Sequence, residues 1–73
     1  MKKILIAKLE KVQRAEFMRL LMDAQIALGL RASKEVADSL VRDPNQVIEI
    51  EDEYFTAFVL GLEQMEIDYK AVD

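Results

Sequence analysis

The side chains that most often carry out catalysis are scarce in this 73-residue chain. Its serine and threonine hydroxyls lie at Ser33, Ser39 and Thr56, and the chain has neither histidine nor cysteine. A hydroxyl nucleophile needs a neighbouring base to remove its proton, and histidine is the usual one. The same absence removes the imidazole and thiolate ligands that zinc prefers. We therefore predict a protein that is not an enzyme and that binds no metal and no cofactor.

Three consecutive carboxylates, at Glu51, Asp52 and Glu53, form the strongest candidate for a metal site. They stand at the start of a helical apolar pattern, where the positive end of the helix dipole stabilises negative charge. Consecutive residues at a helix start point in different directions, so they do not converge on one ion. The predicted role of this triplet is helix initiation.

Basic residues follow a glycine-centred turn in the middle of the chain. The segment Leu28-Gly29-Leu30 separates two stretches with helical periodicity. A residue that ends a helix often needs a positive φ, which costs a residue with a Cβ but not glycine. We expect a helix–glycine–helix corner with a cationic rim that binds an acidic protein partner. The predicted partner-binding residues are Gly29, Leu30, Arg31 and Lys34, with Arg42 as a further cation. The alternative is that Lys34 belongs to the ordinary solvated face of a short helix.

Charge is unevenly divided along the chain, although the net charge is −4. Residues 1–42 hold nine of the ten basic residues and five of the fourteen acidic ones. This division fits either scattered surface charge or a basic helical face for an acidic partner. Nucleic-acid binding is a weaker alternative, because the overall acidity opposes attraction to phosphates. It would use the cations Lys2, Lys3, Lys8, Lys11, Arg14 and Arg19.

Periodicity predicts the elements that position these residues. Residues 3–9 and 46–50 alternate as strands, and residues 67–71 close the chain as a third strand with Tyr69 facing inward. Helical spacing covers residues 12–27 and extends the apolar stripe to Leu28. A second helix runs to residue 42 with Ser33 as its N-cap. A third helix opens at residues 51–53, and its Gly61 indicates close approach to another helix or a small contact surface.

The order strand-helix-helix-strand-helix-strand predicts an α+β two-layer fold (β-α-α-β-α-β), with residues 1–73 as a single domain. The first strand carries apolar residues on both faces, so we place it at the centre. The sheet is then three-stranded and mainly antiparallel, in the order 2-1-3, and three helices cover one face. The uncovered face would hold Ile4, Ile6, Val47 and Val72. Such a face is most simply a homodimer contact, and the alternative is four scattered exposed aliphatic residues.

Compartment signals are absent from the sequence. No apolar run approaches the roughly 20 residues needed to span a bilayer. The apolar residues 4–7 follow two lysines, but the run is too short for a signal peptide and lacks a small-residue cleavage site. The expectation is a soluble cytoplasmic protein without membrane contacts.

The chain resembles the C-terminal domain of the bacterial ribosomal stalk protein, here as a free-standing domain. That family carries a Leu-Gly-Leu-Lys-x-Ala-Lys-Asp pattern followed by an aliphatic pair, an acidic residue and often serine. The pattern corresponds to residues 28–39 here, and the resemblance extends over nearly the whole chain. It implies the ClpS-like fold and a role in translation, because the first two helices of this domain recruit translation factors. The positions that correspond to the factor-binding surface are Gly29, Leu30, Arg31 and Lys34.

Two positions depart from the family pattern. A basic position on the first helix falls at Asp23, and the glycine that usually ends the third helix is replaced near Glu66. We also expect neither the N-terminal dimerisation segment nor the flexible hinge of a stalk protein. Two further roles stay open: a small viral or mobile-element regulator of host machinery, and an adaptor of the Clp protease, which has the same fold.

Overall fold

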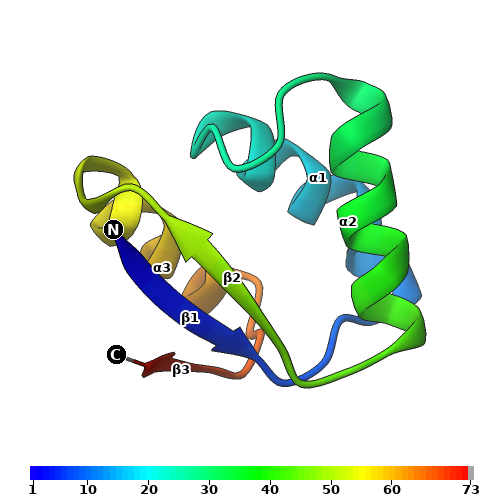
Figure 1. Cartoon of the computed structure of the whole chain (residues 1–73). Helices are drawn as coiled ribbons and strands as arrows, with labels where there is room; N and C mark the ends of the chain where they lie inside the picture. The colour runs from blue at the N-terminus through cyan, green and yellow to red at the C-terminus, as the bar shows by residue number, and fades with distance from the viewer. Residues whose placement is uncertain (73) are drawn as a thin grey trace.

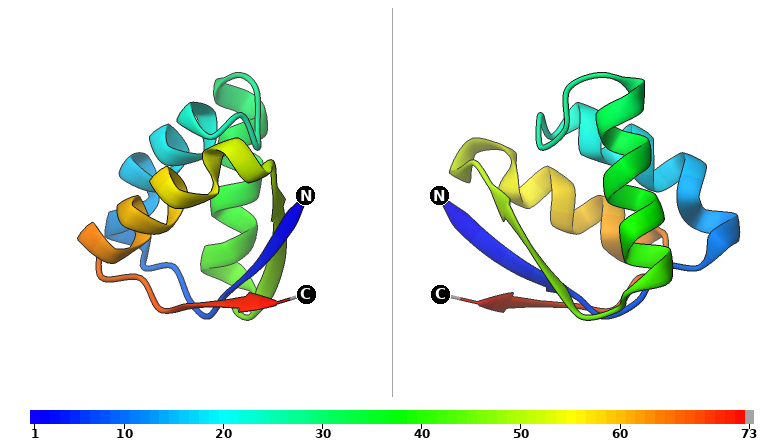
Figure 2. Two further views of the ribbon diagram at one scale, coloured as in Figure 1. Left: turned by 90° about the vertical axis from the view of Figure 1, so that its left-hand side faces the viewer. Right: turned by 45° about the vertical axis from the view of Figure 1, so that its right-hand side comes forward.

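A three-stranded antiparallel sheet forms one layer of the structure, and three helices form the other (Figures 1 and 2). The computed structural model describes residues 1–72. β1 lies between β2 and β3 and pairs antiparallel with both, which confirms the predicted α+β fold and the strand order 2-1-3. The elements are β1 (Lys2–Ile6), the short 3-10 helix η1 (Lys11–Gln13), α1 (Arg14–Asp23), α2 (Leu30–Arg42), β2 (Gln46–Ile50), α3 (Asp52–Gln64) and β3 (Tyr69–Val72).

The face of the sheet that meets the helices differs from the predicted one. Ile4 and Ile6 are fully buried in the core, whereas we expected them on the uncovered face. Ile4 pairs with Ile48, so both point toward the helices. Val47 pairs with Leu5 and lies on the opposite face, where 53% of its surface is exposed. The predicted dimer face is therefore wrong for both isoleucines.

The error comes from Leu9, which the prediction placed in the same strand as Leu5. Leu9 is 1% exposed and does belong to the core. However, β1 ends at Ile6, and the chain has turned before it reaches Leu9, so strict alternation no longer relates the two leucines. The uncovered face consequently carries Lys3, Leu5, Val47, Glu49, Lys70 and Val72.

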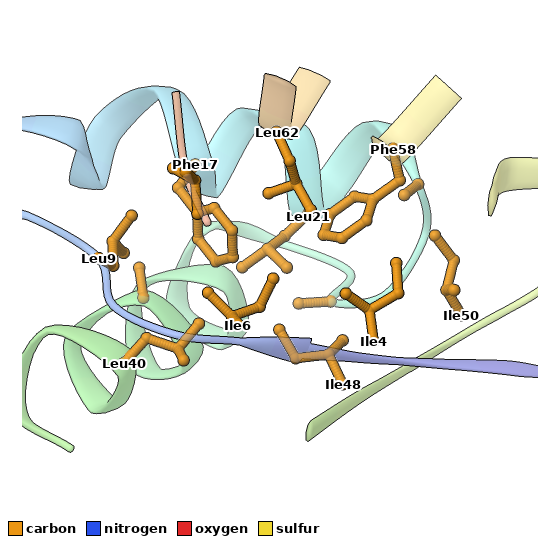
Figure 3. Close-up of a cluster of buried hydrophobic side chains, with 14 residues drawn as sticks. Ile4, Ile6, Leu9, Phe17, Leu21, Leu40, Ile48, Ile50, Phe58 and Leu62 are labelled. Carbon is orange, nitrogen blue, oxygen red and sulfur yellow. The ribbon is translucent and has the colours of Figure 1, made fainter. Parts of the chain in front are cut away.

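One core of aliphatic and aromatic side chains joins the two layers (Figure 3). Phe17 of α1 meets Phe58 of α3 edge to face, with ring centroids 6.3 Å apart and an interplanar angle of 62°. Such a pair contributes roughly 0.5–1.5 kcal/mol beyond the area that it buries. Leu21 and Leu62 extend this contact toward Ile6 of the sheet. The helical spacing of these residues is what predicted the two apolar stripes.

Two helices end in the same hydrogen-bonding pattern without glycine. After α1, the Ile26 amide donates to the Leu21 carbonyl (3.0 Å) and Gln25 adopts φ 56°. After α3, the Ile67 amide donates to the Leu62 carbonyl (2.9 Å) and Glu66 adopts φ 57°. These are Schellman motifs, in which a left-handed residue reverses the chain. The first helix therefore ends at Asp23 and does not reach residue 27 as predicted.

The close approach predicted at Gly61 is confirmed. A Cβ on Gly61 would lie 2.5 Å from the Leu20 Cδ1 atom, so the absent side chain lets α3 pack against α1.

Tyr69 pairs with Ile6, is half-buried on the helix-facing side and donates a hydrogen bond from its hydroxyl to Glu63 Oε2 (3.0 Å). β3 begins at Tyr69, two residues later than predicted, while Ile67 is buried ahead of it. Within residues 1–72, none of the helices has the length and apolar character that a bilayer crossing demands.

Candidate functional site

The connection between α1 and α2 presents an exposed surface, which we call the corner surface. It comprises Leu28, Gly29, Leu30, Arg31 and Lys34. The connecting segment after Asp23 is held in place from beneath, because Ala24 and Ala27 are 5% and 6% exposed. The chain then rises to the start of α2 at one end of the helical layer (Figure 1). The corner surface is therefore supported by buried neighbours although its own side chains are exposed.

Gly29 sets the direction of α2. Its φ of 95° and ψ of 158° lie in a region that only glycine adopts readily. The positive φ agrees with the prediction, but Gly29 is the N-cap of α2, and the left-handed residue that follows α1 is Gln25. Ser33 was predicted as the N-cap and lies one turn inside α2 instead. It is fully buried, its amide donates to the Gly29 carbonyl (3.2 Å) and its hydroxyl donates to the Leu30 carbonyl (3.0 Å).

Two leucines project from the corner surface into solvent. Leu28 is 74% exposed and Leu30 is 67% exposed, so they flank Gly29 as an apolar pair. Leu30 was predicted as a possible contact, whereas Leu28 was assigned to the core stripe of the first helix. That assignment is wrong because the Schellman motif ends α1 before the stripe reaches Leu28. The available signal for Leu28 was its position beside a glycine and a second leucine at a turn.

Positive charge accumulates beside these leucines. Arg31 and Lys34 lie in the first turns of α2, and both are exposed. Neither Arg31 nor Lys34 forms an ion pair within residues 1–72, where the paired cations are the Met1 amine, Lys8, Arg14 and Arg42. The first turn of α2 has no acidic residue, and no side chain caps it. The positive end of the helix dipole therefore adds to the charge of the two side chains.

The remaining cations do not join the corner surface. Arg42 lies at the opposite end of α2 and pairs with Asp43 (3.7 Å). Arg14 donates to Asp38 Oδ1 (2.9 Å) and thereby ties α1 to α2. Lys8 pairs with Glu10 (3.5 Å) at the far end of β1. The cations considered for nucleic-acid binding are thus distributed over several elements, some of them beside carboxylates.

Most of the side chains considered for catalysis or metal binding are buried, hydrogen-bonded, or placed at the start of a helix. Ser33 is inaccessible, and the Ser39 hydroxyl lies 3.3 Å from Gln46 Oε1. Glu51 is the N-cap of α3, and Asp52 pairs with the Met1 amine (3.3 Å). Across residues 1–72 no three acidic, histidine or cysteine side chains converge as ligands for an ion. Four of the predicted partner-binding residues, Gly29, Leu30, Arg31 and Lys34, lie on the corner surface, and Arg42 does not.

Comparison with known proteins identifies no relative: no family model, curated protein or solved structure matches this chain. Function must therefore be inferred from the chain's own residues. The corner surface offers exposed apolar area beside two cations that form no ion pair within residues 1–72, a combination suited to binding another molecule.

Proposed function

We propose that the protein is a non-enzymatic interaction module that binds an acidic segment of another protein through the corner surface. One observation carries the proposal. The start of α2 combines two exposed leucines with two cations, Arg31 and Lys34, that oppose the helix dipole. Exposed leucines lower solubility, and cations at the start of a helix oppose its dipole. Residues that are locally unfavourable in this way are expected where a surface has a function.

The chemistry of the corner surface defines the partner. Carboxylates of the partner would lie near Arg31 and Lys34, while an apolar side chain would fill the space over Leu28 and Leu30. Burying each leucine contributes on the order of 1–2 kcal/mol. The charges contribute mainly to the rate and specificity of association, so binding should weaken as salt is added.

The resemblance to the ribosomal stalk domain makes a translation factor the first candidate partner and the cytoplasm the first candidate compartment. The same surface would also serve a viral or mobile-element protein that acts on host machinery, or an adaptor of the Clp protease. Asp23, where that family has a basic residue, is the last residue of α1 and lies outside the corner surface, so the proposal rests on the corner surface and not on that position.

Affinity capture with the variant Arg31→Glu/Lys34→Glu tests the proposal. Proteins retained from a lysate of the native host by the wild type are identified by mass spectrometry, and one purified partner is titrated against both proteins. We expect the charge reversal to raise the Kd about tenfold or more. The matched control is Lys11→Glu/Arg19→Glu, which changes the net charge equally at exposed positions elsewhere. An unchanged partner list and an unchanged Kd for Arg31→Glu/Lys34→Glu would refute the proposed site.

A further inference from the structure

The sheet ends at β2 on one side, and that edge is unpartnered within residues 1–72. β2 runs from Gln46 to Ile50 and pairs only with β1, in a sheet of order β2-β1-β3. The outer edge of a terminal strand presents a row of backbone donors and acceptors that can pair with another chain. Lysine and proline are two of the residues that protect such an edge; neither occurs within Gln46–Ile50, whose one charged residue is Glu49.

A groove follows this edge. Figure 1 shows that α2 and β2 meet where residues 43–45 connect them and then diverge toward the other end of β2. The space between them is an open hollow of about 370 Å³. Its apolar lining is Ile26, Val36, Val47 and Ile48, and its polar lining is Glu35, Ser39 and Gln46. Residues from both faces of β2 contribute, which places the hollow along the strand edge and not over one face.

Hydrogen bonds fix the width of this groove at its narrow end. The Gln46 side-chain amide donates to the Ser39 carbonyl (3.0 Å) and to the Asp43 carbonyl (2.7 Å). The Asp43 amide in turn donates to the Ser39 carbonyl (2.7 Å) at the end of α2. These contacts hold the last turn of α2 against the start of β2. The groove is therefore preformed, which lowers the cost of filling it.

We propose that this groove binds an extended, basic segment of another protein as a fourth strand beside β2. Backbone pairing with the free edge supplies affinity, and alternate side chains enter the apolar hollow between Val36 and Ile48, on the helix-facing side. The intervening side chains lie on the uncovered face beside the exposed Glu49, which favours lysine or arginine there, and Glu35 of α2 adds a second acidic group at the rim of the hollow. This surface is distinct from the corner surface and prefers the opposite charge in its partner.

A displayed library of random dodecapeptides tests the proposal on the intact chain. Selection should enrich sequences that alternate apolar residues with lysine or arginine. A synthetic peptide of the enriched sequence is then titrated by fluorescence anisotropy. The variant Val47→Lys adds an edge charge and should weaken binding about tenfold or more. The matched control Val72→Lys makes the same change on the other outer strand, on the same face of the sheet, and should leave binding unchanged.

Amide hydrogen exchange supplies the second readout. In the free protein, alternate amides of β2 point away from β1 and should exchange rapidly, and the peptide should slow them about tenfold or more. Binding should persist in Arg31→Glu/Lys34→Glu, which separates this proposal from that of the corner surface. No enriched sequence, binding that survives Val47→Lys in a folded variant, or exchange protection elsewhere would overturn the proposal. A free chain that sediments as a dimer through β2 would also overturn it, because the occupant would be a second copy.

Discussion

The contact between Gly61 and Leu20 yields a quantitative test of how α1 and α3 pack. Alanine in place of a mid-helix glycine normally stabilises a helix by roughly 0.8–1.0 kcal/mol. Here, however, a Cβ on Gly61 would lie 2.5 Å from Leu20 Cδ1 and 3.0 Å from Leu20 Cδ2. Forcing an extra methyl group into a packed contact costs about 1–3 kcal/mol. The clash involves the tip of a half-buried side chain that can rotate, so a cost near 2 kcal/mol is reasonable.

Gly61→Ala should therefore lower the free energy of unfolding by about 1 kcal/mol in the wild-type chain. In a Leu20→Ala background the clashing methyl groups are gone, and the same substitution should raise that free energy by about 1 kcal/mol. The interaction energy between the two positions is then about 2 kcal/mol. Urea unfolding of the four proteins, followed by circular dichroism at 222 nm, measures it.

A matched control lies on the exposed side of the same helix. Ala57 is exposed, and Ala57→Gly should lower the free energy of unfolding by about 1 kcal/mol whether position 20 is leucine or alanine. The packing argument fails if Gly61→Ala has the same effect in both backgrounds. It also fails if Gly61→Ala stabilises the wild-type chain as much as an exposed helical position would.

Three further predictions concern the start of α2 and the end of the chain. Arg31→Glu/Lys34→Glu should change the free energy of unfolding by less than about 1 kcal/mol in urea, because the gain at the helix dipole is offset by i,i+4 repulsion of the new glutamates from Glu35 and Asp38; a larger loss would mean that these cations stabilise α2. Gly29→Ala should lower that free energy by about 1–3 kcal/mol, because φ 95° with ψ 158° suits glycine alone; equal stability would contradict this account. The hydrogen bond to Glu63 raises the pKa of Tyr69, so Glu63→Ala, which removes the acceptor, should lower that pKa in an NMR titration. Because the folded-state pKa is raised, this stabilisation is complete below about pH 10 and is lost as pH rises through that pKa; an unshifted titration would exclude the interaction.

Periodicity predicted the elements and their order because the apolar residues of each element serve one packed core. The central position of β1 followed from apolar side chains on both faces, and Ile4 and Leu5 do lie on opposite faces. The face that meets the helices could not be predicted. Leu9 is buried for a reason unrelated to strand alternation, since the chain turns after Ile6.

The candidate site was predicted in part. Gly29, Arg31 and Lys34 could be predicted because a glycine between two helical stretches indicates a turn, and cations beside a turn are expected at the surface. Leu28 was missed because nothing in the sequence marks Gln25 as the left-handed residue that ends α1. Glutamine rarely adopts φ near 56°, so the motif depends on tertiary contacts, among them the burial of Ala24 and Ala27. The groove beside β2 was also missed, since it arises from two elements whose separation only the folded chain defines.

Gln25 and Glu66 adopt a left-handed conformation that glycine would adopt at a lower cost in free energy. The left-handed conformation costs a residue with a Cβ about 1 kcal/mol. Gln25→Gly and Glu66→Gly should therefore each raise the free energy of unfolding by a similar amount. For a domain of this size, each would raise the melting temperature by about 4–8 °C. Neither change alters the core, the corner surface or the groove beside β2. A lineage that acquired them could accept destabilising changes on either binding surface and so explore new partners.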